Sequence, residues 1–192
     1  MRRALLPLLV LALLAISLLE GVARAGDLEP IDVDRGLVLV TRALSYDRNL
    51  RDRAEGTLGV ALVALSGAEP SRTHAARRRL IAMEGVSVQG LPLRIVELPT
   101  GEALESALVR EQVDVAVLVG GAPPEELERV SGVLRGHRVL TLSLEPEHLG
   151  HGCGVGVGVE RGRARLVVDL TAARSSGADF SGELLQLAKV MR

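Results

Sequence analysis

The sequence predicts an α/β fold: a single-layer, mostly parallel sheet flanked by helices, with a C-terminal antiparallel hairpin and a closing helix. Short, nearly continuous apolar runs of strand length alternate with helix-length segments that carry an apolar stripe. This pattern is typical of a parallel sheet covered on both faces. Near the C-terminus, two runs of alternating residues flank the two-residue turn Arg161-Gly162, which indicates a hairpin.

The first 25 residues predict a signal peptide. Arg2 and Arg3 precede the apolar run from Ala4 to Leu19, and Ala23-Arg24-Ala25 offers a small-x-small cleavage site after Ala25. The run is shorter than the roughly 20 residues that a spanning helix needs, so an uncleaved membrane anchor is the less favoured alternative. We therefore expect residues 26–192 to be one exported, periplasmic domain.

Composition limits what this exported part can do. Its 20 basic and 23 acidic residues give a net charge of −3, which argues against nucleic acid as a partner. One Phe, one Tyr and no Trp leave Leu, Val and Ala for the core, so we expect no aromatic-lined pocket. The one cysteine, Cys153, is either buried or an intermolecular link, and burial is favoured because free cysteine is among the most buried residue types.

The first helix is expected before the first strand. Asp32 or Asp34 can cap it, and the polar segment 45–56 ends it. Its apolar stripe consists of Leu37, Val40 and Leu44. The first strand follows at 57–65, an apolar run that is too short for a helix.

Three helix–strand units come next. A helix at about 69–84 stops at Gly85 and leads to a strand at 91–98. Thr100 caps a short helix before the strand at 112–119. Pro123-Pro124 open the last of these helices, before the strand at 137–143. Right-handed crossovers and economy of connection predict strand order 2-1-3-4, with the hairpin extending one edge.

The C-terminal segment should close the sheet. A short turn or helix starts at Thr171. Ser181 then caps a final helix with i, i+3, i+4, i+7 spacing, which we expect to dock on the hairpin and cover it. Its stripe consists of Leu184, Leu187, Ala188 and Met191.

The glycine-rich strand does not predict a cofactor. Gly152-x-Gly154-x-Gly156 lacks the third glycine at the dinucleotide spacing, because Val157 stands there. A strand and a turn follow, whereas a dinucleotide needs a helix N-terminus for its pyrophosphate. Instead, Gly154, Gly156 and Gly158 share one strand face, which leaves room for another backbone or helix to approach closely.

The loop after the fourth strand carries potential metal ligands. They are Glu145, Glu147, His148, His151 and Cys153. Zinc or copper accepts such N and S donors, but the spacing matches no standard metal motif. A solvated loop followed by a buried strand cysteine is therefore favoured, and no metal is expected.

Hydrolytic chemistry is poorly supported, so we predict that the protein is no enzyme. Ser66 follows a strand in the context Leu-Ser-Gly-Ala, which is not the Gly-x-Ser-x-Gly elbow. Nothing places His74 beside it. The expected helix at 69–84 also carries a basic patch, which is either a solvated face or a site for a membrane surface or an acidic partner. The patch consists of Arg72, His74, Arg77, Arg78 and Arg79.

One geometric rule points to a site. In open α/β sheets, ligands lie beyond the carboxyl ends of the strands, at the switch point. Small residues and free backbone N–H groups there are suited to a small anion or a partner's loop, although ordinary turns explain them equally well. The candidate ligand- or partner-binding residues are Ser66, Gly67, Gly120, Gly121, Ser143, Glu145, His148 and His151.

The C-terminal third resembles the YfiR-like (YfiR/HmsC-like) family of periplasmic regulators. The residues that carry the resemblance are Val139-Leu140-Thr141-Leu142-Ser143, Gly152 to Val159, Gly162-Arg163, Val168-Asp169-Leu170, Ala172-Ala173 and Ser181 to Ala188. Upstream, Leu44-Ser45-Tyr46-Asp47-Arg48-Asn49-Leu50 is similar to one branch of the family. Asp169 stands where the family usually has Asn, and the cysteine pairs common in members are missing, so disulfide-based control is not implied.

The resemblance implies an exported, non-enzymatic protein that restrains a membrane-bound signalling enzyme. In this family the partner is often a diguanylate cyclase of cyclic di-GMP signalling, bound through its extracytoplasmic domain. For this chain a homodimer is one of the forms in which it could bind that partner. The alternative hypothesis is a periplasmic small-molecule-binding protein that uses the crevice at the carboxyl ends of the strands.

Overall fold

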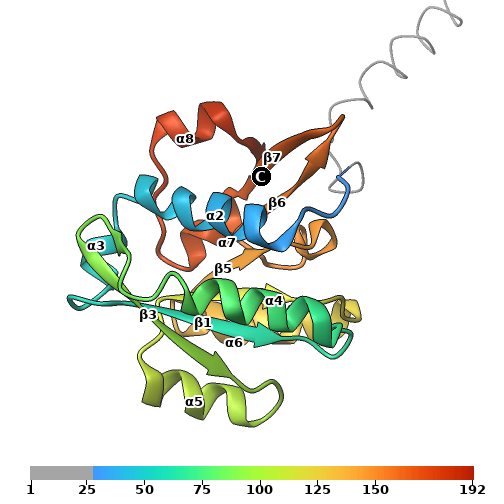
Figure 1. Ribbon diagram of the computed structural model, residues 1–192. Coiled ribbons are helices and arrows are strands. Elements are labelled where there is room, and N and C mark those ends of the chain that lie inside the picture. Colours follow the sequence, from blue (N-terminus) through green and yellow to red (C-terminus); the bar gives the residue numbers. More distant parts are fainter. Residues whose placement is uncertain (1–27) are drawn as a thin grey trace, which may run out of the picture.

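A computed structural model describes residues 28–192 of the 192-residue chain; the predicted signal peptide lies outside the described residues. One sheet dominates the fold, in the order β2-β3-β1-β4-β5-β6-β7-β8 (Figure 1). Its strands are β1 (Leu58–Ala64), β2 (Ser87–Val88), β3 (Leu91–Leu98), β4 (Val115–Val119), β5 (Leu140–Ser143), β6 (Val155–Glu160), β7 (Arg163–Asp169) and β8 (Lys189–Met191).

The parallel part of the sheet confirms the predicted strand order. Strands β3, β1, β4 and β5 are parallel neighbours, which is the order 2-1-3-4 expected for the four apolar runs. Strand β6 adds a further parallel neighbour beside β5, and β7 returns antiparallel to β6. The short β2, which the sequence analysis did not predict, pairs antiparallel with the start of β3.

Helices cover both faces of the sheet. The helical segments of the described chain are α2 (Val33–Ala43), η2 (Leu44–Tyr46), α3 (Leu50–Arg53), α4 (Pro70–Ile81), α5 (Ala103–Glu111), α6 (Pro124–Gly136), η3 (Pro146–His148), α7 (Leu170–Ser175) and α8 (Gly182–Leu187). Asp32 caps α2 as expected, since its carboxylate accepts from the Arg35 N–H (3.0 Å). Helix α5 starts at Ala103 and not next to Thr100, because Gly101, at φ +83°, intervenes. Among residues 28–192, no helix has the length and apolar character to cross a bilayer.

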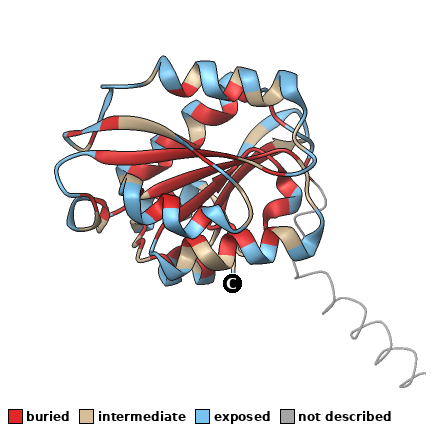
Figure 2. Ribbon diagram, turned by 90° about the horizontal axis from the view of Figure 1, so that it is seen from below, coloured by how far each residue is buried: buried red, intermediate tan, exposed pale blue. Residues whose placement is uncertain are grey.

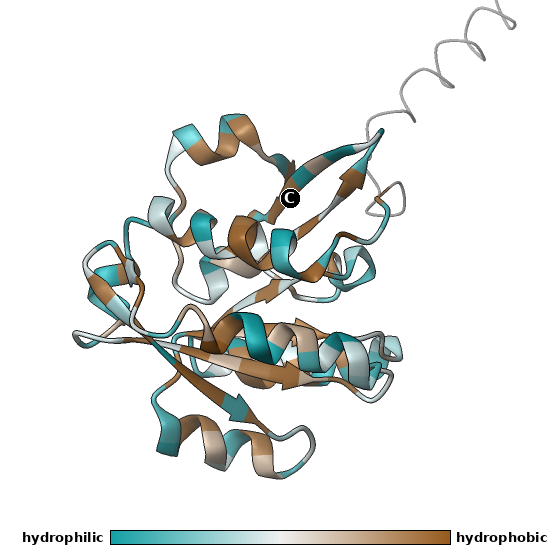
Figure 3. Ribbon diagram, viewed as in Figure 1, coloured by the Kyte–Doolittle hydropathy of each residue, from teal (hydrophilic) through white to brown (hydrophobic). Residues whose placement is uncertain are grey.

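The two helical layers form separate hydrophobic cores. Along β1, Val60 and Leu62 pack with α2 and α4, whereas Ala61 and Val63 pack with α5 and α6. The central strands β1, β4 and β5 are therefore buried on both faces, while the outer faces of the helices stay exposed (Figure 2). Hydropathy follows the same division, with apolar strands inside and polar helix faces outside (Figure 3). Burial on both faces explains why these central strands are apolar at nearly every position.

The C-terminal hairpin forms as predicted. Arg161 and Gly162, at φ +51° and +74°, make a turn with two left-handed residues, the type that suits two-residue hairpins. The prediction of close approach to the glycine face of β6 is also confirmed. A Cβ on Gly158 would lie 3.0 Å from the backbone oxygen of Glu29, whose N–H donates to the Val159 carbonyl (2.9 Å). The N-terminal segment thus pairs with the end of β6 through Glu29 and Val159, next to a glycine that leaves room for its backbone.

The predicted closing helix is wrong in its second half. Ser181 caps α8 and Leu184 is buried, but the helix ends at Leu187, which is 64% exposed. Residues 189–191 instead form β8, which pairs in parallel with the free edge of β7. Met191 therefore reaches its apolar contacts, the small cluster of Leu28, Leu149 and Val167, from a strand. Backbone hydrogen bonds to the open edge of β7 stabilise these residues more than a second turn of helix would, although the sequence pattern is helical.

A buried carboxylate connects the segment before β1 and the segment between α7 and α8 with the sheet. Asp47 is fully buried between η2 and α3. Its carboxylate accepts from the N–H groups of Asn49 (3.0 Å) and Asp179 (2.9 Å) and pairs with Arg53 (2.6 Å). Arg53 in turn donates to the backbone oxygens of Asp114 (3.3 Å) and Arg138 (3.4 Å), just before β4 and β5. We call Asp47, Arg53 and these partners the Asp47 cluster.

Loss of the Asp47 carboxylate should be costly. We expect Asp47→Ala to lower the free energy of unfolding by about 3–5 kcal/mol, because the buried Arg53 guanidinium loses its partner. The control is Asp179→Ala, which removes the exposed pair with Arg48 and should cost less than about 1 kcal/mol. Urea unfolding followed by circular dichroism measures both, and equal losses in the two variants would contradict the assignment.

Candidate functional site

The carboxyl edge of the sheet brings together the ends of β1, β4 and β5, as the switch-point rule requires. Gly67 and Gly121 form an isolated bridge, in which the Gly67 N–H donates to the Gly121 carbonyl (2.9 Å). Gly120 has φ +88°, and a Cβ there would lie 2.2 Å from Ala68 Cα. Only glycine fits this approach of two backbones. The glycines at this edge therefore serve contact between strand ends, and their N–H groups are not all free.

Glu145 occupies the place where the sequence suggested an external anion. Its Oε1 accepts from the Gly120 N–H (3.4 Å) and from Arg72 Nε (2.6 Å), and its Oε2 accepts from Arg72 Nη2 (3.2 Å). Arg72 comes from α4, so this two-point pair fastens the helix to the loop after β5. A cavity of about 240 Å³ remains beside the pair, lined by Pro30, Gly67, Glu69, Arg72, Gly120, Gly121 and Glu145.

His148 lies beneath this edge and is fully buried. Its Nε2 is 3.1 Å from the Gly120 carbonyl, which can only accept, so Nε2 carries the proton. Nδ1 then accepts from the Ser143 hydroxyl at 2.6 Å. The sequence analysis named both Ser143 and His148 as candidates but did not predict that they bond to each other. Because both are buried, no substrate reaches the pair, and its role is to join the ends of β4 and β5.

Two of the eight sequence-predicted residues lie apart from the others. The Ser66 hydroxyl donates to the Glu126 carboxylate on α6, and its N–H donates to the same carboxylate (3.1 Å). His151 Nδ1 faces Glu128 of α6 at 3.5 Å. The carboxyl edge thus gathers Gly67, Gly120, Gly121, Ser143, Glu145 and His148. Ser66 is instead hydrogen-bonded to α6, and His151 faces that helix.

The histidine loop does not gather metal donors. Both ring nitrogens of His148 have protein partners, and within residues 28–192 no three His, Cys, Asp or Glu side chains converge. Cys153 is buried as expected, and this burial raises the pKa of its thiol to about 12. Such a thiol is protonated at neutral pH and unreactive.

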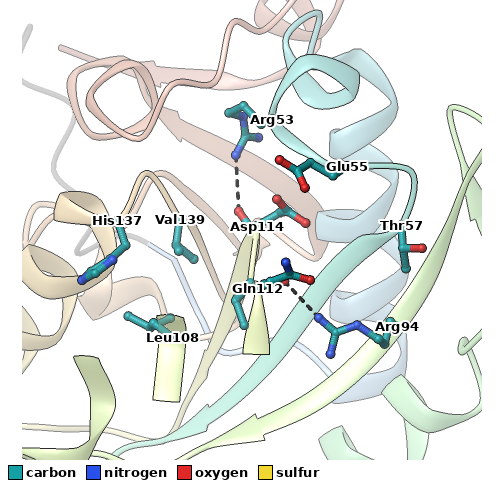
Figure 4. Close-up of a pocket in the computed structure, with 10 residues that line it drawn as sticks. Arg53, Glu55, Thr57, Arg94, Leu108, Gln112, Asp114, His137 and Val139 are labelled. Atoms are coloured by element: carbon teal, nitrogen blue, oxygen red, sulfur yellow. Dashed lines mark hydrogen bonds between the residues drawn. The ribbon is translucent and has the colours of Figure 1, made fainter. Parts of the chain in front are cut away.

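A larger cavity lies at the opposite, amino edge of the sheet, where the sequence analysis predicted no site. It measures about 390 Å³ and is lined by Arg53, Glu55, Thr57, Arg94, Leu108, Gln112, Val113, Asp114, His137 and Val139. Figure 4 shows Glu55 and Asp114 close together on one side, with Arg94 and His137 at opposite ends. The available sequence signal was Asp114, a charged residue inside an otherwise apolar strand run. This cavity shares Arg53 with the Asp47 cluster.

The burial of His148 gives the fold a pH dependence. Burial lowers the pKa of His148 below its usual 6.5, although Glu147 and Glu145 act in the other direction. The neutral ring therefore stabilises the fold fully above about pH 6.5; below that, the unfolded chain takes up a proton that the folded chain resists. We expect the unfolding free energy to fall between pH 7 and pH 5, approaching about 1.4 kcal/mol per pH unit from this group.

The variant His148→Gln should show a shallower fall, although it is less stable at pH 7. His74→Gln, which changes an exposed histidine of α4, is the matched control and should keep the slope of the unaltered protein. Urea unfolding at a series of pH values gives the slopes. An unchanged slope in His148→Gln would refute the assignment.

Two solved structures share this fold, and a third is less similar. A conserved domain protein from Vibrio cholerae superposes with a TM-score of 0.54 at 13% identity, covering 83% of this chain and 60% of that one. An "ABC domain in complex with L-Trp" from Streptococcus pneumoniae gives a TM-score of 0.54 at 10% identity, with 83% and 62% covered. A fatty acid ABC transporter substrate-binding protein from Thermomonospora curvata gives 0.40 at 17% identity, with 61% and 29% covered. The chain thus spans about three fifths of the length of the first two.

Sequence comparison identifies the family. No curated protein matches the chain. The family model described as YfiR/HmsC-like matches residues 64–189, which is more than half of the chain and runs from the end of β1 into β8. The match includes both the glycine hairpin and the C-terminal segment. The chain therefore belongs to the YfiR/HmsC-like family of periplasmic regulatory proteins.

Proposed function

We propose that the protein is an exported, non-enzymatic regulator that binds the extracytoplasmic domain of a membrane-bound signalling enzyme and restrains it. Residues 26–192 act as its one exported domain, and a diguanylate cyclase or similar sensor is the partner that the family suggests. The observation that carries this proposal is the family match over residues 64–189. The surface of the molecule supports it.

The two helical layers differ in charge. Helices α2 and α4 together carry six arginines and one acidic residue, whereas α5 and α6 carry three arginines and five glutamates. Since both layers sit on the same sheet, one face of the molecule is basic and the other is acidic. A basic face attracts an acidic partner surface and raises the rate of encounter.

Apolar side chains lie among the arginines of this basic face. On α2, Arg35, Val38 and Arg42 form an exposed stripe, opposite the buried Leu37 and Val40. On α4, His74, Arg77, Arg78 and Ile81 form a second exposed stripe. Val38 is 41% exposed and Ile81 53%. Protein interfaces combine arginine with apolar groups. We therefore assign the binding site for the partner to the α2/α4 face.

The carboxyl-edge crevice offers less to the alternative, a small-molecule-binding protein. Its cavity is about 240 Å³, below the roughly 300 Å³ at which ligand pockets usually begin. Arg72 and the Gly120 N–H, the groups best suited to an anionic solute, already bind Glu145. A solute would have to displace this carboxylate. The crevice therefore favours a structural role.

Charge reversal tests the proposal and the face together. The tagged protein is expected to co-purify with the extracytoplasmic domain of an inner-membrane sensor, and Arg42→Glu/Arg78→Glu should weaken this binding at least tenfold, about 1.4 kcal/mol. The matched control, Arg110→Glu/Arg129→Glu, reverses two exposed arginines of α5 and α6 and should bind normally. Calorimetric titration with the captured domain measures both.

The two ways to fail are distinct. If no inner-membrane protein associates with the unaltered chain, the proposed function is wrong. If a partner binds both double variants equally, the function stands and the α2/α4 face is wrong.

A further inference from the structure

The cavity at the amino edge of the sheet has the properties of a binding site that the regulatory role does not explain. Its volume of about 390 Å³ lies in the range of small-molecule pockets. It is formed by the starts of β1, β4 and β5 together with Arg94 of β3, α3 and the ends of α5 and α6. Its wall is partly charged and partly aliphatic, so the charges decide which ligand fits.

The two arginines of the cavity are already bound to the protein. Arg53, whose side chain is only 6% exposed, pairs with Asp47 at 2.6 Å. Arg94 donates to the backbone oxygens of Glu111 and Gln112, the latter at 3.0 Å, and lies 4.0 Å from the Glu111 carboxylate. Asp47 therefore balances the charge of Arg53, and Arg94 is fixed through its Nη2 beside the Glu111 carboxylate, so both arginines are held by the protein itself.

The two carboxylates of the cavity, in contrast, have no ion-pair partner within 4 Å among the described residues. Asp114 Oδ2 accepts from the Gly59 N–H (2.9 Å), which leaves its other oxygen without a protein donor in the same part of the chain. Glu55 is exposed at the rim, and its carboxylate points into the same space as that of Asp114 (Figure 4). Two like charges side by side repel each other and attract a cation.

The electrostatic surroundings of Asp114 favour a cationic ligand. Burial raises the pKa of Asp114, and the charge of Glu55 adds to the rise, against the Gly59 N–H, Arg53 and Arg94. Without a ligand, the ionised form is therefore less stable than that of an ordinary aspartate. A bound cation would stabilise the ionised carboxylate of Asp114.

The aliphatic part of the cavity wall indicates whether a metal ion or an organic cation fits. Leu108, Val113 and Val139 line the cavity next to the carboxylates, and such side chains offer nothing to a hydrated metal ion. They suit a hydrocarbon group instead. We propose that the cavity binds a small organic amine, with its ammonium group at Asp114 and Glu55 and its hydrocarbon body against Leu108, Val113 and Val139. This inference does not depend on the membrane partner.

Three probes of equal length isolate the head group. Pentan-1-amine, pentan-1-ol and pentanoate are titrated into the purified protein at pH 7 and constant ionic strength, and binding is followed by NMR shifts of backbone amides. Saturable binding of the amine is expected with a low-millimolar Kd, as suits about six non-hydrogen atoms. The alcohol should bind at least tenfold more weakly, and pentanoate should not bind. The shifts should centre on Asp114 and Val139.

Conservative variants then identify the carboxylates. Asp114→Asn keeps an acceptor for the Gly59 N–H and should weaken amine binding at least tenfold. Glu55→Gln, at an exposed position that folding does not need, should weaken it several-fold and decides the matter if Asp114→Asn fails to fold. The control Glu102→Gln, an exposed glutamate at the far end of α5, should bind as the unaltered protein does. Tighter binding of pentanoate, amine binding that ignores both carboxylate variants, or no saturable amine binding would overturn the proposal.

Discussion

The fold depends on one buried ion pair, between Asp47 and Arg53. The Asp47 carboxylate accepts a hydrogen bond from the backbone N–H of Asp179 in the C-terminal segment. Arg53 donates to backbone oxygens just before β4 and β5. Close by, Asn49 Nδ2 donates to the Gly177 carbonyl (3.1 Å) and the Ser181 N–H donates to the Tyr46 carbonyl (2.9 Å). A buried charge is tolerated only where it is paired and hydrogen-bonded, so this cluster admits one arrangement of the three segments.

The two edges of the sheet differ in which of their charged side chains are paired within the protein. At the carboxyl edge, where α/β proteins commonly bind ligands, Glu145 and Arg72 satisfy each other and the glycines bridge the strand ends. At the amino edge, Arg53 pairs with Asp47 and Arg94 donates to two backbone oxygens, whereas the carboxylates of Asp114 and Glu55 have no ion-pair partner within 4 Å among the described residues. The exposed arginines of α2 and α4 lie on neither edge, which leaves a separate face for a partner. We therefore place docking on a helical face and ligand binding at the amino edge.

Much of the fold was predictable because it follows from the local spacing of apolar and turn residues. The apolar runs of β1, β3, β4 and β5, and the Arg161-Gly162 turn, are patterns within ten residues of sequence. The end of the chain was not predictable in this way, since Ala188 to Met191 continue a helical stripe and only the free edge of β7 makes them a strand. The amino-edge cavity was missed for a related reason: Arg53 and Asp114 are 61 residues apart, and the switch-point rule points to the other edge. The family-like stretch 44–50 was a signal, and its physical content is the contact with residues 177–181.

Native-state hydrogen exchange of the backbone amides tests most directly whether the Asp47 cluster holds both terminal segments to the sheet. The account predicts that the amides of Asn49, Asp179 and Ser181 exchange only through global unfolding, with the same opening free energy as Val117 in the central strand β4. Fast exchange of Asp179 and Ser181 while Val117 stays protected would show that the C-terminal segment opens on its own, and it would contradict the account.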